Sequence, residues 1–194
     1  MNTTKLSKEI IEFIERPTTQ SFLISAQRYI DIIENAKNDK LEEFIEKMQP
    51  ALVELYLAGL KLDMIDVKYS TNSKHFQAIS DKRFDKIHES LESIFNEYPS
   101  TWKVSNPMGI ESQRVYKNWI DENFEQIYLE LKDEITKMNK VATNEAVEDA
   151  FWHLKTSYIN RWGNEHCINA IQALHCIKYR EYDIFTMKLM TQQN

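Results

Sequence analysis

Apolar residues recur at three- and four-residue spacing along most of the chain, the spacing that places them on one side of an α-helix. Short polar or proline-containing breaks separate the runs. The pattern therefore predicts a succession of helices, over about residues 6–16, 20–34, 40–62, 81–98, 111–138, 144–162 and 164–179.

Two prolines set helix boundaries in this pattern. Pro17 ends the first helix, because proline lacks an N–H and its ring blocks the preceding turn. Thr18 or Thr19 can then cap the second helix with its side-chain oxygen. Pro50 lies in the middle of the third run, so we expect a bend or two abutting helices around Gln49. The count is therefore seven or eight helices.

Other local signals refine the boundaries. Asp39, with Glu42 three positions later, has the spacing of a capping box and predicts the start of the third helix. Residues 100–109 are expected to be irregular, with Thr101 to Val104 extended by composition and Asn106-Pro107 as a turn signal. The long fifth helix should begin at about Glu111.

The last predicted helix is apolar nearly all round. Gly163 interrupts the pattern before it, and Asn164 can cap it. A helix with apolar residues on several faces is usually buried at the centre of a domain. We therefore predict an all-α, single-domain bundle over residues 1–194, with a buried C-terminal helix and a C-terminal extension at 182–194. One face carries Ala170, Ala173, Leu174 and Ile177, and another carries Ile168, Ile171 and Tyr182.

Composition excludes several classes of protein. The 194 residues include only three glycines and four prolines, too few for the many tight turns of a β-sandwich or barrel. Phosphate-binding loops need several glycines close together, and the glycines here, Gly59, Gly109 and Gly163, are far apart. Nucleotide binding through such loops is therefore excluded.

The charge of the chain argues against nucleic acid and membrane partners. With 30 acidic and 24 basic residues, the formal net charge is −6, which repels polyanions and anionic lipid. The densest apolar run, Ala51 to Leu62, is too short for a membrane span and contains Glu54. We expect neither a nucleic acid nor a membrane as partner.

The two cysteines and the N-terminus point to the cytoplasm. Cys167 and Cys176 are nine residues apart on one predicted helix, about 13 Å along its axis, too far for a disulfide within that helix. The first sixteen residues carry charges among their apolar positions, so they lack the apolar core of a signal peptide. We expect reduced thiols and a cytoplasmic location.

Tryptophan and histidine gather in the C-terminal third of the chain. Tryptophans with histidines suit a ligand pocket or a partner-binding cleft, formed where an irregular loop meets the last two helices. The alternative is that the tryptophans are core anchors whose indole N–H meets a carbonyl. Both alternatives remain open from the sequence. The residues concerned are Trp102, Trp152, Trp162, His166 and His175.

One group of residues suggests metal chemistry. Glu145, Asp149 and His153 follow at four-residue intervals and can project from one helix face, with His166 as a further ligand. The same spacing is ordinary on a solvated helix face, and the paired Glu-x-x-His signature of dimetal bundles is absent. A metal-dependent helical hydrolase using Asp149, His153 and His166 is therefore the alternative function. We assign no metal ligand, cofactor or catalytic residue.

Three segments together resemble a known family. They are Trp102-Lys103-Val104-Ser105-Asn106-Pro107, the run from Asn123 to Lys132 containing Ile127-Tyr128, and Trp162-Gly163 followed by Ala170-Ile171-Gln172-Ala173-Leu174-His175. Their order is similar to that in the bacterial domain-of-unknown-function-5063 family. The resemblance implies a helical fold and carries no activity with it.

The sequence therefore favours a non-enzymatic module that recognises a protein partner or a small ligand. No motif has catalytic geometry, and the chain is acidic and rich in aromatic positions. We expect a monomer or a homodimer.

Overall fold

The structure is a computed structural model, and it describes residues 6–70, 78, 80–104 and 115–179. Helices dominate it, with one antiparallel pair of short strands, so the predicted all-α class is confirmed. The elements in chain order are α1 (Lys8–Glu15), α2 (Pro17–Asn35), the 3₁₀ helix η1 (Ala36–Asn38), α3 (Leu41–Lys61), α4 (Asp81–Ile94), β1 (Ser100–Val104), β2 (Val115–Trp119), α5 (Ile120–Val141), α6 (Asn144–Asn160), the π-helix η2 (Trp162–Cys167) and α7 (Ile168–Lys178).

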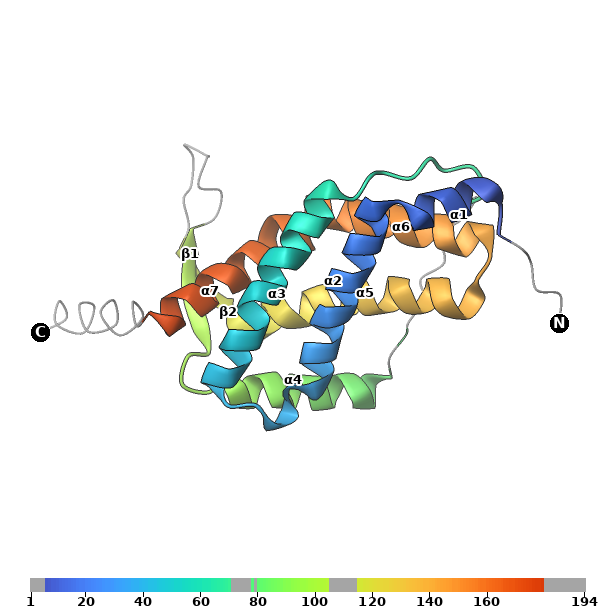
Figure 1. The fold of residues 1–194 in the computed structure, drawn as a ribbon. Helices are drawn as coiled ribbons and strands as arrows, with labels where there is room; N and C mark the ends of the chain where they lie inside the picture. The colour runs from blue at the N-terminus through green and yellow to red at the C-terminus, as the bar shows by residue number, and fades with distance from the viewer. Residues whose placement is uncertain (1–5, 71–77, 79, 105–114, 180–194) are drawn as a thin grey trace, which may run out of the picture.

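The helices form two layers (Figure 1). The antiparallel pair α2 and α3 lies in front of the antiparallel pair α5 and α6, and α7 runs beside α3. Helix α4 lies along the lower edge against α5, and the β1–β2 hairpin stands at one end. None of the described helices has both the length and the apolar character needed to cross a membrane.

Aromatic side chains hold the layers together. The ring of Phe44 in α3 meets those of Phe95 and Phe124 edge to face, with centroids 5.6 and 5.5 Å away. Phe95 and Phe124 stack on each other at 5.3 Å. All three rings are fully buried, so this cluster joins α3, the end of α4 and α5.

Two predicted helix starts were wrong. Pro17 is the first residue of α2, a position where its missing N–H costs nothing, so neither threonine caps the helix. Helix α3 begins at Leu41 after Lys40, which makes no side-chain cap bond. The Asp39 carboxylate instead accepts a hydrogen bond from Lys47 at 2.7 Å, one helix turn and a half inside α3.

Pro50 does not divide α3, which continues through it from Leu41 to Lys61. Of the two predicted alternatives, the abutting helices are therefore wrong, and the bend around Gln49 stays a prediction. Proline costs a helix one hydrogen bond and a steric contact. We attribute the continuity to the packing of α3 against α2 on one side and α7 on the other, which buries its apolar face along the full length.

The segment before α5 is a β-hairpin and not the start of a helix. Ser100–Val104 pairs antiparallel with Val115–Trp119, with Ser100 opposite Trp119 and Val104 opposite Val115. The helix predicted over 115–119 is therefore wrong, and the predicted helix start, Glu111, lies outside the described residues. Aromatic and β-branched residues are abundant in 115–119, and such residues favour a strand once a partner strand is available.

Helix α6 ends at Asn160, and Arg161 has non-helical backbone angles (φ −137°, ψ −90°), so the break lies two residues before Gly163. A π-helix then leads into α7, and the predicted Asn164 cap is wrong. A Cβ atom at Gly163 would lie 2.5 Å from the carbonyl oxygen of Tyr158, so only glycine fits there. Helix α7 buries the predicted face of Ala170, Ala173, Leu174 and Ile177, whereas Ile168 is exposed.

We predict that Gly163→Ala destabilises the protein by about 1–3 kcal/mol, because the added methyl group must displace backbone. Urea unfolding measures the change. The neighbouring Asn164→Ala, at an exposed position, is the control and should change stability by less than about 0.5 kcal/mol. An unstrained glycine-to-alanine change stabilises a chain, so a gain at position 163 would contradict the packing described here.

Candidate functional site

The structure separates the two tryptophans of the α6 region. Trp162 is 0% exposed, and its ring packs against Tyr158, 5.0 Å between centroids, and Phe22, 6.3 Å between centroids. Trp152 is 38% exposed and lies edge to face against His153. Trp162 therefore belongs to the core, and Trp152 belongs to the surface.

The histidines of the predicted cleft lie in different surroundings. His166, in the π-helix, has Nδ1 3.2 Å from the Asn123 side-chain oxygen on α5. His175 is exposed near the end of α7, with its ring 4.6 Å from that of Tyr179. The side chain of Trp102 lies outside the described residues. A cleft formed by all five residues therefore stays a prediction.

Asp149 and His153 belong to a buried ionic cluster between α5 and α6. The Lys137 ammonium lies 2.6 Å from Asp149 Oδ2 and also pairs with Glu134. His153 Nε2 lies 3.5 Å from the other oxygen of Asp149. The lysine thus stands between two carboxylates, where it supplies the positive charge that a metal ion would otherwise bring.

This geometry removes support from the hydrolase alternative. Asp149 and His153 face Lys137, whereas His166 hydrogen-bonds to Asn123. In the described part of the chain, the three predicted ligands do not form a group with ligand atoms within 4.8 Å of one another. They therefore do not form one metal site.

Burial sets the protonation of the ionic cluster. It raises the pKa of Glu134 to about 7 and lowers the pKa of His153. Burial alone would lower the pKa of Lys137, but hydrogen bonds to Asp149 and Glu134 outweigh it and raise that pKa. Lys137 is therefore a fixed cation, and Glu134 is the group that gains a proton near neutral pH.

A second buried carboxylate holds a loop in place. Glu148 of α6 is fully buried and accepts hydrogen bonds from the backbone N–H groups of Lys68, Tyr69 and Ser70, at 2.7, 2.8 and 2.7 Å. Three charge-assisted bonds satisfy the buried anion and attach the chain after α3 to α6. We assign Glu148 a structural role.

A third polar group lies between α4 and α5. His88 Nδ1 is 2.7 Å from Glu125 Oε1, and Asp121 stands one helix turn before Glu125. One ligand atom from each of the three residues lies within 4.8 Å of the others. The four-residue spacing of Asp121 and Glu125 was visible in the sequence, but nothing there indicated that His88 would join them.

The outer face of α3 carries three exposed apolar side chains that are not part of the core. Val53, Leu57 and Leu60 are between 47% and 58% exposed. Their four- and three-residue spacing aligns them on one stripe. On a helix this stripe lies opposite the buried face that contains Phe44 and Leu55, so it points directly away from the core.

Helix α2 extends this surface. An ion pair between Arg28 and Glu54 fixes the register of the two antiparallel helices. Ile24, one turn before Arg28 and 68% exposed, is therefore beside the turn of α3 that contains Leu57. We call the outer surface of Ile24, Arg28, Val53, Glu54, Leu57, Leu60 and Lys61 the α2–α3 face.

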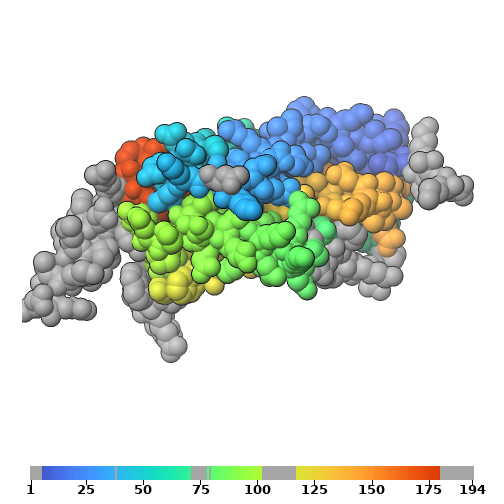
Figure 2. Space-filling view, turned by 90° about the horizontal axis from the view of Figure 1, so that it is seen from below, coloured from blue at the N-terminus to red at the C-terminus, as the bar shows by residue number. Residues whose placement is uncertain are grey.

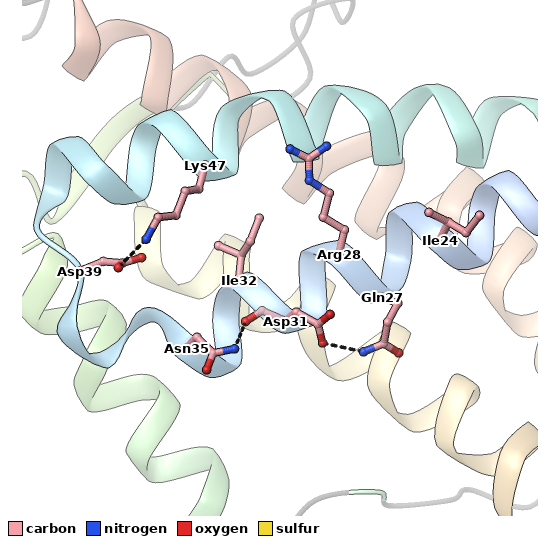
Figure 3. A pocket seen from close by; sticks show the side chains of 8 residues that line it. All are labelled: Ile24, Gln27, Arg28, Asp31, Ile32, Asn35, Asp39 and Lys47. Atoms are coloured by element: carbon pink, nitrogen blue, oxygen red, sulfur yellow. Dashed lines mark hydrogen bonds and ion pairs between the residues drawn. The ribbon is translucent and has the colours of Figure 1, made fainter.

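A groove of about 500 Å³ continues the α2–α3 face toward the start of α3 (Figure 3). Its charged side chains already have partners: Lys47 pairs with Asp39, Arg28 pairs with Glu54, and Asp31 accepts a hydrogen bond from the Gln27 amide. The lining residues are Ile24, Gln27, Arg28, Asp31, Ile32, Asn35, Asp39 and Lys47.

We predict that Trp162→Ala lowers the free energy of unfolding by about 3–5 kcal/mol, because it leaves a cavity under α2 and α3. Trp152→Ala is the matched control, since it removes the same side chain from a position that is 38% exposed, and it should cost less. Chemical denaturation of both variants gives the comparison. Equal losses would show that Trp162 is not a core anchor.

We also predict a pH dependence that depends on Glu134. Because its folded-state pKa is raised to about 7, the folded protein retains a proton that the unfolded chain loses above its ordinary value of 4.5. The contribution of Glu134 to the free energy of unfolding therefore falls as pH rises from about 4.5 to about 7. In Glu134→Gln this decline disappears, so the variant gains stability relative to the parent over that range.

Urea unfolding at several pH values between about 4.5 and 7.5 measures this difference. Glu46→Gln, at an exposed position of α3, is the control and should follow the parent. A difference between Glu134→Gln and the parent that does not vary with pH would contradict the raised pKa.

Comparison with known proteins agrees with the helical architecture. No curated protein matches the chain. The crystal structure of protein BF1032 from Bacteroides fragilis is similar, with 21% sequence identity, coverage of 86% of this chain and 96% of that chain, and a TM-score of 0.70. At that identity the likeness shows a shared fold alone. The model of the family DUF5063, a domain of unknown function, matches residues 13–180. The match confirms the resemblance found in the motifs, and the chain belongs to the DUF5063 family.

Proposed function

We propose that the chain is a non-enzymatic protein-interaction module, that the α2–α3 face is its interaction surface, and that a second copy of the chain is the partner this face fits. The observation that carries the proposal is the exposed apolar stripe of Val53, Leu57 and Leu60 opposite the core. Contiguous exposed apolar surface on a folded domain typically marks a contact with another molecule.

The stripe is self-complementary. When two α3 helices pack antiparallel about a two-fold axis at Leu57, this residue meets its own counterpart and Val53 faces Leu60 of the second copy. The same arrangement brings Glu54 close to Lys61 of the second copy, on the side of the helix that faces α2. Three apolar pairs, one of Leu57 with its counterpart and two of Val53 with Leu60, would then be flanked by two opposite-charge pairs.

The charges of the monomer are compatible with this contact. Glu54 pairs with Arg28, and its side chain is 52% exposed, so it can also accept from a second cation. Lys61 is exposed in the last turn of α3. The interface is small against the roughly 800 Å² per partner of a standard complex, so we expect dimers at protein concentrations on the order of 0.1 mM.

Small-ligand recognition in the neighbouring groove has less support. The groove has the volume of a ligand site, but Lys47 and Arg28 are already paired with Asp39 and Glu54. A ligand would have to compete with those contacts.

We propose the reducing cytoplasm of a bacterium as the location. Within the described residues neither Cys167 nor Cys176 forms a disulfide, and Cys167 is buried, which fits a compartment where thiols stay reduced. The net charge of −6 argues against nucleic acid as a partner.

We predict that the protein self-associates with rising concentration and that Leu57→Glu abolishes this, because it places two carboxylates at the two-fold axis. Sedimentation velocity at about 10 µM to 1 mM measures the association. Ile159→Glu is the matched control, because Ile159 on α6 is 49% exposed and Leu57 is 47% exposed. The control should associate like the parent.

A charge exchange tests the register independently. Lys61→Glu should weaken the dimer by repulsion from Glu54 of the second copy, and the double variant Glu54→Lys with Lys61→Glu should recover it. A parent that stays monomeric throughout, or association unaffected by Leu57→Glu, would overturn the proposal. Circular dichroism of each variant establishes that the fold is intact.

A further inference from the structure

The polar group between α4 and α5 contains a chemically mixed set of donors. An imidazole comes from His88 of α4, and two carboxylates come from Asp121 and Glu125, which occupy successive turns of α5. Their donor atoms lie within 4.8 Å of one another. Small rotations of the side chains shorten these distances to those between neighbouring ligands of one metal ion. Donors on two different helices thus converge on one point.

The burial of this group is uneven. The Glu125 side chain is 7% exposed, whereas the His88 side chain is 46% exposed. A small ion can therefore reach the donors from the side of α4, which forms part of the surface visible in Figure 2. The buried Glu125 carboxylate is held in place by the surrounding side chains, and the exposed side of the group leaves room for water as a further ligand.

Negative charge at this point exceeds positive charge. The charged groups that act on Glu125 are His88, Asp121 and Glu122. Those that act on His88 are Glu125, Asp121 and Glu92. These groups are one imidazole and four carboxylates, and this excess of negative charge beside the buried Glu125 is favourable to a bound cation.

We propose that His88 Nδ1 and one carboxylate oxygen each from Asp121 and Glu125 form a site for a divalent transition-metal ion of the zinc class, which ties α4 to α5. Imidazole favours zinc-class ions over magnesium or calcium, and three protein donors with one position left for water are typical of open zinc sites. The metal would replace the hydrogen bond between His88 and Glu125. The site does not depend on the α2–α3 face.

Isothermal titration of the full chain with zinc chloride, after chelator treatment and dialysis, tests the proposal. We expect one saturable equivalent and a melting temperature that rises with zinc. Glu125→Gln and Asp121→Asn should each weaken binding by at least about 10-fold, because even an outer-shell partner of a metal contributes that much. Both variants keep the shape of the side chain, and their melting curves in chelator establish that they fold.

Glu89→Gln, one position after His88 on an exposed part of α4, is the matched control and should bind zinc like the parent. Cobalt substitution gives a second readout, since His88→Gln should change the visible spectrum of the bound ion if imidazole is a ligand. Absence of saturable binding, or equal binding by the parent and both carboxamide variants, would show adventitious surface binding only and would overturn the proposal.

Discussion

The burial of α5 is the constraint on which the rest of the structure depends. This helix contacts α2, α4 and α6, and it carries ionisable side chains on two of its flanks. Toward α4, Glu125 is bonded to His88, and toward α6, Lys137 is bonded to Asp149. An unpaired buried charge costs several kcal/mol, so these contacts restrict how α4 and α6 can lie around α5. Apolar burial drives the helices together, and the polar pairs select one arrangement among those that burial would allow.

The helical class was predictable because each helix needs only one apolar stripe, which the sequence displays directly. The errors occurred where a distant contact decides the local structure. Residues 115–119 fit a helix by spacing, but pairing with 100–104 makes them a strand. Gly163 predicts a break, but the break lies at Arg161 and Gly163 belongs to a π-helix that packs against Tyr158. Pro50 predicts a bend or two abutting helices, but α3 continues past it as one helix, packed against α2 and α7.

The candidate sites were less predictable than the fold for the same reason. Spacing within a helix brings Asp149 and His153 together, and the structure confirms that contact. Spacing does not say that Lys137 from another helix occupies the place between the carboxylates. It also does not say which tryptophan is buried, because that depends on the position of Phe22 in α2 beside Trp162. Contacts between helices require the relative rotation of both, and a single sequence contains no direct signal for it.

The buried charged side chains and the exposed apolar side chains of the molecule differ in the contacts that they make. Lys137 and Glu148 find their partners within the described chain, so their burial has a structural explanation. Leu57, in contrast, is 47% exposed on the side of α3 opposite the core. The proposed contact with a second copy would remove this stripe from water. The α2–α3 face and the group of His88, Asp121 and Glu125 share no residue, and the side chain of His88 is 46% exposed, so the two proposals are independent of each other.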